Sequence, residues 1–246
     1  MKGIILVPMA GEGNRFKNEG YSIPKQLVNI FDKTMIEWSM NCIDYEDYKI
    51  IFIVREEHIK NYNIDIFLKN KFGDDCEIIS TNKTTEGTVS TCLMAEEYID
   101  NDLPLLITTL DVFFEPKLIF QSLFTSDDGT ILIFDSENES YSYSLIGDDG
   151  YVIKTEEKKL ISNNASVGIY HFSNSSIFLK YAKLLIKNNI RINNEFYICP
   201  IYNLLIKDGL KIKTKKVKTV NPLGTPEEIN NFIKTHDRTF FINGYL

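Results

Sequence analysis

The first residues with recognisable chemistry could together bind a polyphosphate. Gly11 and Gly13 allow a tight turn whose backbone N–H groups face a bound anion. Arg15 follows at once and carries a planar, permanently charged guanidinium that suits phosphate oxygens. Further on, Pro24 holds the chain extended and presents Lys25, a compact positive charge. Each feature alone would more often be a tight turn or a solvated basic loop, but the ordered pair predicts a phosphate-binding loop.

The elements that must position these side chains follow from the apolar pattern. Residues 4–9 form a short apolar run that is typical of a buried strand. Two more strand patterns, over 49–54 and 76–80, alternate with helical patterns over about 35–43 and 56–72. The order strand–helix–strand–helix–strand predicts a parallel sheet with helices on its faces.

Two further segments at strand ends could contribute to the same site. The apolar strand pattern over 105–111 ends on Asp111, and a carboxylate at the end of a central strand suits Mg2+. Taken alone, an acid here would more often cap the next turn. The polar segment 81–88 leads into a helix predicted over 89–99, with Thr88 as its N-cap. This is where ligands of open α/β sheets bind, although most Gly-Thr pairs before a helix are simple caps.

The second half of the chain has an α+β pattern without an evident linker or repeat. A hairpin with an Asp- and Gly-rich turn is predicted from residue 141 to 156. The late strand over 210–217 carries several lysines, which suit an exposed edge strand better than a nucleic-acid patch. The remaining expected elements are strands over 130–135 and 167–172 and helices over about 175–188, 198–208 and 227–234.

Composition limits the functions that need consideration. The 246 residues fit one large α/β domain, and a net charge of −7 argues against a general nucleic-acid binder. A local cluster of positive charge can still bind one nucleotide. The four cysteines form no C-x-x-C pair, which favours reduced thiols and a cytoplasmic location. No apolar segment approaches membrane-spanning length, so we expect no membrane partner.

The motif G-x-G-x-R after a first strand, followed by P-K-x-L, resembles the N-terminal motif of nucleotidyltransferases that make nucleotide-activated sugars and related compounds. The form V-P-M-A-G in place of L-A-A-G resembles a subgroup found in capsule and surface-polysaccharide gene clusters. The resemblance implies a single Rossmann-like, GT-A-type α/β domain with a mostly parallel central sheet and a smaller antiparallel acceptor-binding portion. It assigns residues 1–125 to a nucleotide-binding half and 126–246 to an acceptor-binding half.

The resemblance also assigns roles around the nucleotide. Arg15 and Lys25 are the expected catalytic residues, and Asp111 is the expected ligand of Mg2+. The residues expected to bind the nucleotide are Ala10, Gly11, Gly13, Glu86, Gly87 and Thr88.

For the acceptor, the resemblance points to an E-K pair, a polar loop and an N/S-x-G-I-Y strand. It implies that Lys158 meets the acceptor's phosphate, that Gly168 lets the backbone approach the acceptor, and that Asn164 and Glu195 contact it. Without the resemblance, lysines beside glutamates are usually a solvated face. For Glu195, an acid at a helix start that interacts favourably with the helix dipole is an equal alternative.

One position departs from the family pattern. Relatives carry an Asp two residues before the glycine of a late D-x-G-T element, where it is the second metal ligand, but this chain has Pro222. Asn221 could take over that role, or the site could use a single metal ion.

The expected reaction is attack of a phosphorylated sugar, polyol or amino-acid-like acceptor on the α-phosphorus of a nucleoside triphosphate, with release of pyrophosphate. CTP is the favoured nucleotide, and the resemblance is compatible with a homodimer. A GT-A glycosyltransferase is a rival, but Asp111-Val112-Phe113 lacks the second acid of D-x-D. A dinucleotide-binding oxidoreductase would need glycine at Phe16. A non-catalytic nucleotide-binding module is favoured only by Pro222.

Overall fold

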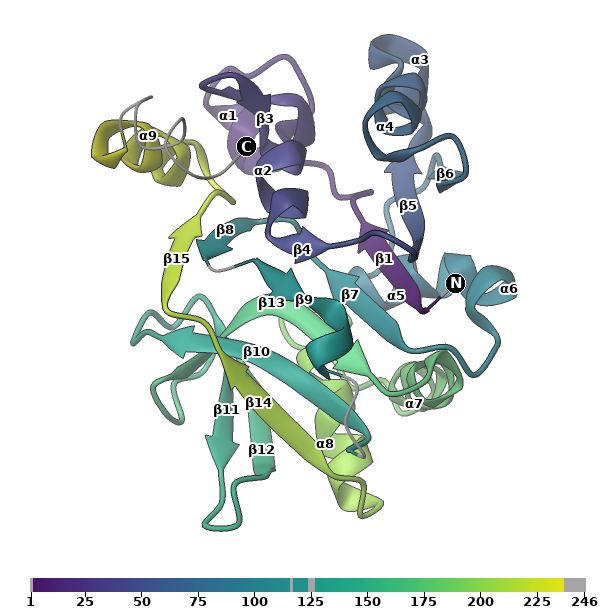
Figure 1. The fold of residues 1–246 in the computed structure, drawn as a ribbon, viewed down its shortest axis with the longest axis vertical. Helices are drawn as coiled ribbons and strands as arrows, with labels where there is room; N and C mark the ends of the chain where they lie inside the picture. Colours follow the sequence, from purple (N-terminus) through teal and green to yellow (C-terminus); the bar gives the residue numbers. More distant parts are fainter. Residues whose placement is uncertain (1, 116, 124–126, 237–246) are drawn as a thin grey trace.

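The apolar runs of the first half form the parallel middle of the central sheet (Figure 1). Strand β1 (Ile4–Pro8) lies between β5 (Lys49–Arg55) and β7 (Leu105–Thr108) and is parallel to both. Strand β6 (Glu77–Thr81) extends the sheet beyond β5, again in parallel. The interior positions of these strands are almost all apolar because helices cover both faces of the sheet.

The computed structural model describes residues 2–115, 117–123 and 127–236 of the chain. Within these residues, no helix has the length and apolar character needed to cross a membrane.

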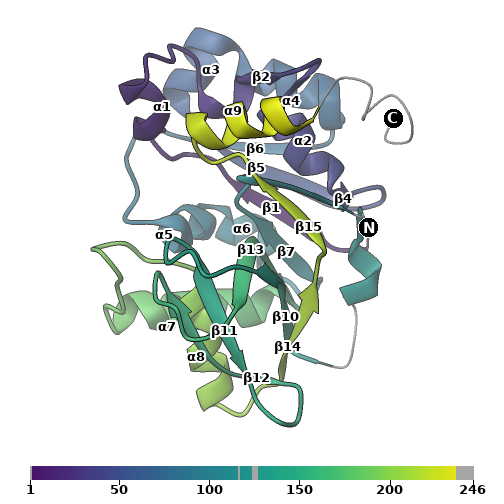
Figure 2. The same cartoon turned by 90° about the vertical axis from the view of Figure 1, so that its left-hand side faces the viewer.

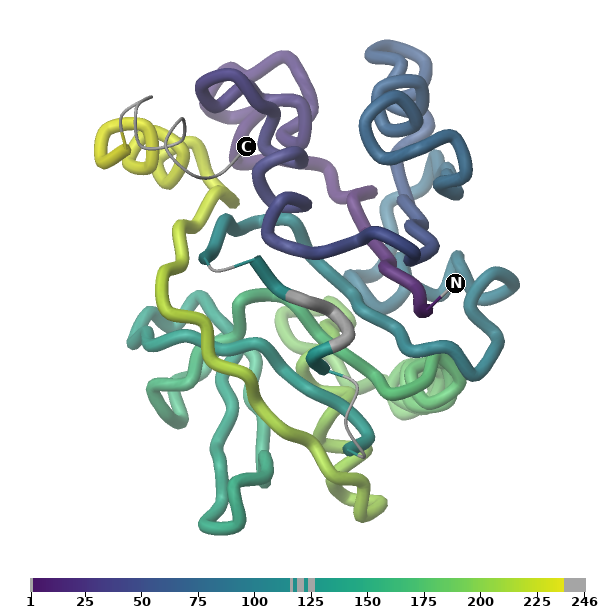
Figure 3. The backbone as a smooth tube through the Cα atoms, in the orientation of Figure 1, coloured from purple at the N-terminus to yellow at the C-terminus, as the bar shows by residue number. Residues whose placement is uncertain are grey.

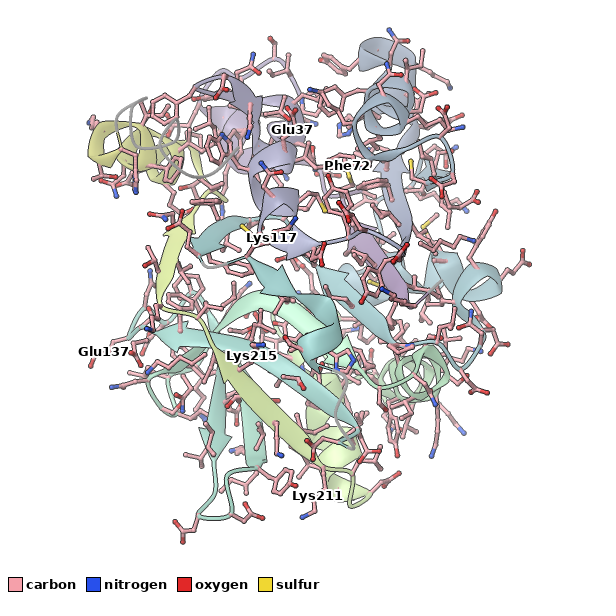
Figure 4. The ribbon with its side chains drawn as sticks, in the orientation of Figure 1. Glu37, Phe72, Lys117, Glu137, Lys211 and Lys215 are labelled. Carbon is pink, nitrogen blue, oxygen red and sulfur yellow. The ribbon has the colours of Figure 1, made fainter. Side chains whose placement is uncertain are left out.

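The second half adds an antiparallel portion to the same sheet. Strand β13 (Asn164–Phe172) pairs antiparallel with β7 and carries the hairpin of β11 (Ser142–Ile146) and β12 (Val152–Glu157). Strand β10 (Gly129–Asp135) also pairs with β13. Strand β14 (Ile212–Lys216) pairs only with β10 among the described strands, so the lysine-rich strand lies at an edge, as its sequence predicted. Figure 4 labels Lys215 on this strand and Lys211 just before it.

Two hydrophobic cores lie on opposite faces of the sheet. Alternation along β1 sends Ile5 and Val7 into one core and Ile4 and Leu6 into the other. The first core is covered by α2 (Met35–Asn41), α4 (Ile64–Phe72) and α9 (Pro226–Thr235). The second is covered by α5 (Thr88–Cys92), α7 (Ser175–Lys187) and α8 (Cys199–Lys207). Figure 2 shows these two groups of helices above and below the parallel strands.

The C-terminal part of the described chain returns to the N-terminal half. Strand β15 (Thr219–Pro222) pairs antiparallel with β8 (Val112–Glu115), which follows β7 directly. Helix α9 then packs its Phe232 ring against Trp38 of α2, with ring centroids 5.8 Å apart. Figure 3 shows the yellow C-terminal segment running from the lower part of the molecule to the upper part. Residues after β15 are thereby brought beside the turn that carries Asp111.

Short elements complete the fold. They are the helices α1 (Asn14–Asn18), α3 (Glu56–Tyr62) and α6 (Glu96–Ile99), the 3-10 turns η1 (Lys25–Leu27), η2 (Leu93–Ala95) and η3 (Phe120–Leu123), and the strands β2 (Asn29–Ile30), β3 (Lys33–Thr34), β4 (Ile43–Asp44) and β9 (Leu118–Ile119).

Three local expectations were wrong. The helix expected over 56–72 is two helices, because Asn63 adopts a left-handed conformation with φ of 49°. The helix expected over 89–99 is divided into α5, η2 and α6. Thr88 is the first residue of α5, and Gly87 occupies the N-cap position with φ of 120° and ψ of 178°. An L side chain is strongly disfavoured in that conformation.

Candidate active site

A cavity of about 560 Å³ opens where β1, β7 and β13 approach one another, and it collects most of the residues singled out from the sequence. The glycine loop and Lys25 line it from the N-terminal half, and Lys158 and Gly168 line it from the C-terminal half. The remaining sequence-predicted residues in its lining are Ala10, Arg15, Gly87, Thr88, Asp111 and Glu195. The two halves of the chain therefore meet at one site.

Lys25 and Asp111 form an ion pair in the lining of this cavity. Their segments are joined only through the fold, since Lys25 begins the turn η1 and Asp111 follows β7. Leu110 immediately before Asp111 has φ of 62°, and its backbone oxygen accepts a hydrogen bond of 2.7 Å from Ser39. Asp111 follows directly in this turn and lines the cavity beside Lys25.

The glycine loop is held by a neighbouring loop. Glu12 accepts a hydrogen bond of 2.6 Å from Thr84 and one of 3.0 Å from Asn14. These hydrogen bonds lower the pKa of the Glu12 carboxyl, the bond from Thr84 most strongly. Gly13 has φ of 67°, and a side chain added there would meet no heavy atom within 4 Å. The space beside the backbone of Gly13 is therefore open.

The end of the cavity that Lys158 lines contains a buried acid that the sequence analysis did not single out. Glu157 is only 9% exposed and accepts a hydrogen bond of 2.5 Å from Ser142. Burial raises the pKa of its carboxyl, and the Ser142 hydrogen bond opposes this. Beside it, the Lys158 ammonium donates to the Tyr197 hydroxyl at 2.5 Å. The pattern E-K was visible in the sequence, but the burial of its glutamate was not.

Gly168 and Gly87 are glycines for steric reasons. A side chain on Gly168, where φ is 85°, would collide with Thr109 Oγ1. A side chain on Gly87 would lie 2.5 Å from the backbone nitrogen of Phe196, whose N–H donates to the Glu86 carbonyl at 2.8 Å. Gly87 allows two backbones to approach closely at the wall of the cavity, and Gly168 allows its backbone to approach the Thr109 side chain.

Two sequence-predicted residues are not brought into the cavity. The Glu86 side chain pairs with Arg191 at 2.9 Å on the outer side of its loop. The Asn164 side chain donates to the Ser144 carbonyl at 3.2 Å, at the start of β13. In this structure both side chains fix neighbouring segments of the chain.

The comparisons with known proteins agree with this geometry. The family model described as Nucleotidyl transferase matches residues 2–203. This chain belongs to the nucleotidyl transferase family. A glucose-1-phosphate thymidylyltransferase of Neisseria meningitidis serogroup A / serotype 4A is 22% identical over 220 residues, which cover 85% of this chain and 72% of that protein.

Solved structures show the same fold. A nucleoside-diphosphate-sugar pyrophosphorylase of Vibrio cholerae RC9 superposes with a TM-score of 0.83 at 26% identity, over 94% of this chain and 99% of that one. A UDP-glucose pyrophosphorylase complexed with UDP-glucose gives 0.74 at 20% identity, over 96% and 100%. The inositol-1-phosphate CTP transferase of T. maritima gives 0.73 at 14% identity, over 95% and 96%. The last two show similarity of fold alone.

This nucleotidyl transferase offers too few side-chain ligands to hold a divalent metal ion without its substrate. Asp111 and Glu228 both line the cavity, and their carboxylate oxygens are ligands that Mg2+ prefers. No group of three or more His, Cys, Asp or Glu side chains that could hold a metal occurs among the residues that the structure describes. The remaining ligands of a metal ion here would be phosphate oxygens and water.

Two other residues of this nucleotidyl transferase's cavity were missed in the sequence. Gln26 is buried and donates to the Met9 carbonyl at 3.2 Å, while its Oε1 has no hydrogen-bond partner among the described atoms. Glu228 is half-buried, and burial raises the pKa of its carboxyl, with a smaller contribution from Asp111. Gln26 lies next to Lys25 in the P-K-x-L motif, and Glu228 follows Thr225 at capping-box spacing, but neither signal identified a site residue.

Proposed function

We propose that this nucleotidyl transferase moves the nucleotidyl group of CTP to the phosphate of a sugar, polyol or amino-acid-like acceptor and releases pyrophosphate. The observation that carries the proposal is that Arg15, Lys25, Asp111 and Lys158 all line one cavity. Both reactants are anionic, so a site that joins them has to offset their repulsion with positive charge.

At the nucleotide end, the glycine loop and Arg15 bind the β- and γ-phosphates in this proposal. Backbone N–H groups at Gly11 and Gly13 and the Arg15 guanidinium supply hydrogen bonds to these oxygens. Lys25 stabilises the charge that builds on the α-phosphate, for which its ammonium shifts from Asp111 toward the phosphate. Asp111 would hold a magnesium ion here, and the ion would supply positive charge that offsets the negative charge of the phosphates.

At the acceptor end, Lys158 and Tyr197 orient the acceptor's phosphate toward the α-phosphorus. An acceptor phosphate oxygen forms a new bond to the α-phosphorus, and the bond from the α-phosphorus to the bridging oxygen of the β-phosphate breaks. Pyrophosphate leaves with that electron pair. No protein nucleophile is required, because the acceptor is already ionised and catalysis comes from alignment and electrostatics.

The choice of CTP and the biological setting are the finer parts of this proposal. Relatives named for thymidylyl, UDP-glucose and inositol-1-phosphate CTP chemistry all share the fold, so CTP, UTP and dTTP are the nucleotides to compare. The V-P-M-A-G form of the loop supports a role in capsule or surface-polysaccharide biosynthesis in the cytoplasm.

Pyrophosphate release tests the assignment of residues. With Mg2+, a triphosphate and a panel of sugar, polyol and amino-acid phosphates, we expect Lys25→Ala and Asp111→Asn each to lower kcat by about 10²–10³-fold. The matched control is the surface ion pair of Lys2 and Asp47, 3.0 Å apart, whose variants Lys2→Ala and Asp47→Asn should turn over like the wild type. Wild-type turnover in both Lys25→Ala and Asp111→Asn would show that the site residues are wrongly assigned.

A further inference from the structure

The strand that should bring a second acid to Asp111 carries none. Pro222 stands where the family pattern has an Asp, and its register partner on β8 is Val112, the residue after Asp111. Leu223 N donates to the Asp111 carbonyl at 2.8 Å, so the backbone arrives at the expected place. Asn221 pairs with Phe113 and does not belong to the described lining of the cavity, so it does not replace the missing Asp.

Glu228 reaches the same place from the next element. Thr225 caps α9 and accepts a hydrogen bond of 3.1 Å from Glu228 N. The first turn of α9, which contains Glu228, therefore begins close to Gly224. A side-chain carbon added to Gly224 would lie 3.3 Å from Asp111 Cβ, 3.4 Å from Asp111 Cγ and 3.5 Å from Glu228 Oε2. The two carboxyl groups therefore border one small space, which stays open because residue 224 is glycine.

The charges around this space favour a cation. No described lysine, arginine or histidine forms an ion pair with Glu228, although the charge of Arg15 acts on its carboxyl, and the described ion-pair partner of Asp111 is Lys25. Two carboxylates that border one space repel each other, and a divalent cation between them turns this repulsion into attraction.

We propose that Glu228 supplies the second carboxylate for the magnesium ion, in place of the Asp that Pro222 replaces. The inference rests on the proposed function, because it places the ion between Asp111 and the triphosphate. The site would again have two carboxylates, but the second would come from the first turn of a helix and not from a strand. The competing role of Glu228 is structural, since its backbone N–H donates to the Thr225 cap and its side chain stands at the capping-box position of α9.

Mn2+ binding separates the two roles. The electron paramagnetic resonance signal of the free ion measures this binding in the presence of CTP and without acceptor. Glu228→Gln keeps a hydrogen-bond acceptor for the cap and removes the charge. We expect it to weaken Mn2+ binding about tenfold, while its melting temperature without metal stays at or above that of the wild type. Glu228→Asp keeps the charge and should retain more affinity than Glu228→Gln.

The matched control is Glu227→Gln, which makes the same charge change one residue earlier, at an exposed position outside the cavity. It should bind Mn2+ like the wild type. If Glu228→Gln also binds like the wild type while Asp111→Asn binds weakly, this inference is overturned and the proposed function stands. If Asp111→Asn binds Mn2+ as tightly as the wild type, the metal site of the proposed function fails together with the inference.

Discussion

Glu157 combines a role in the cavity with a cost to the folded state. It is 9% exposed, and the Ser142 hydroxyl is its described hydrogen-bond donor. Burial raises the pKa of its carboxyl above the ordinary value of 4.5. A carboxyl whose pKa is raised on folding contributes its full stability below the unfolded pKa and loses it as the pH rises through the folded pKa.

Glu157→Gln should therefore stabilise the protein at neutral pH. The neutral amide avoids the burial of charge and still accepts a hydrogen bond from Ser142. We expect the melting temperature at pH 7.5 to rise by about 2–4 °C, and the gain to vanish as the pH falls below the ordinary carboxyl pKa. Thermal unfolding of the wild type and of Glu157→Gln, from pH 7.5 down to below the ordinary carboxyl pKa, measures this difference in melting temperature. A lower melting temperature for Glu157→Gln at pH 7.5 would contradict the prediction.

Which single residues line the cavity was predictable from the sequence where those residues belong to a local motif. Arg15 and Lys25 belong to contiguous motifs, and the structure places both in one cavity. Glu157 and Glu228 were missed because their significance depends on burial and on neighbours distant in the chain. Gln26 was missed for the same reason, since its unpartnered oxygen is visible only in the folded chain.

At the scale of elements, the N-terminus of α5 is fixed by a close backbone approach. Gly87 lies against Phe196 of the segment before α8, and Val89 N donates to the Phe196 carbonyl at 3.0 Å. This contact joins two segments of the cavity wall, one at Gly87 and one at Tyr197 and Ile198.

Gly87→Ala should be costly in stability and in nucleotide affinity. The added carbon would lie 2.5 Å from a backbone atom, and the φ of 120° is one that alanine rarely adopts. We expect a loss of roughly 3 kcal/mol in the free energy of unfolding. The control is Gly150→Ala in the hairpin turn, where φ is 79° but no heavy atom lies within 4 Å, with an expected loss of about 1 kcal/mol. Equal losses in urea unfolding would show that the approach to Phe196 does not matter.

The strands were better predicted than the helices. The apolar runs over 4–9 and 49–54 became β1 and β5 within a residue or two, because burial on both faces leaves a continuous signal. The break between α3 and α4 depends on one left-handed Asn63, and periodicity continues across it. The division of 89–99 was likewise invisible, because Cys92, Ala95 and Ile99 are buried at helical spacing throughout.

At the scale of the whole molecule, helix α9 near the C-terminus packs against the N-terminal half of the chain. Phe232 is 2% exposed, and its ring centroid lies 5.8 Å from those of Trp38 and Phe113. This cluster holds the segment from Gly224 to Glu228 against the Asp111 turn. The return of α9 could not be read from the sequence, because the pairing of β15 with β8 joins segments far apart in the chain.

Phe232→Ala should loosen this packing. Removing a buried ring from the cluster should cost about 3–5 kcal/mol in the free energy of unfolding, and it should weaken Mn2+ binding because α9 carries Glu228. The neighbouring Ile233→Ala is the control, since Ile233 is 38% exposed and should cost less than about 1 kcal/mol. Denaturant unfolding measures both, and an equal cost would show that α9 does not depend on the aromatic cluster.

The fate of the three phosphates tests the central claim most directly. CTP labelled separately on the α- and the γ-phosphate is incubated with the enzyme, Mg2+ and the panel of phosphorylated acceptors, and the labelled products are separated. We predict that the α-label moves into a conjugate with one acceptor while the γ-label leaves in pyrophosphate, in equal amounts. Recovery of the α-label in CDP together with the γ-label in inorganic phosphate, or acceptor-independent cleavage, would contradict the account.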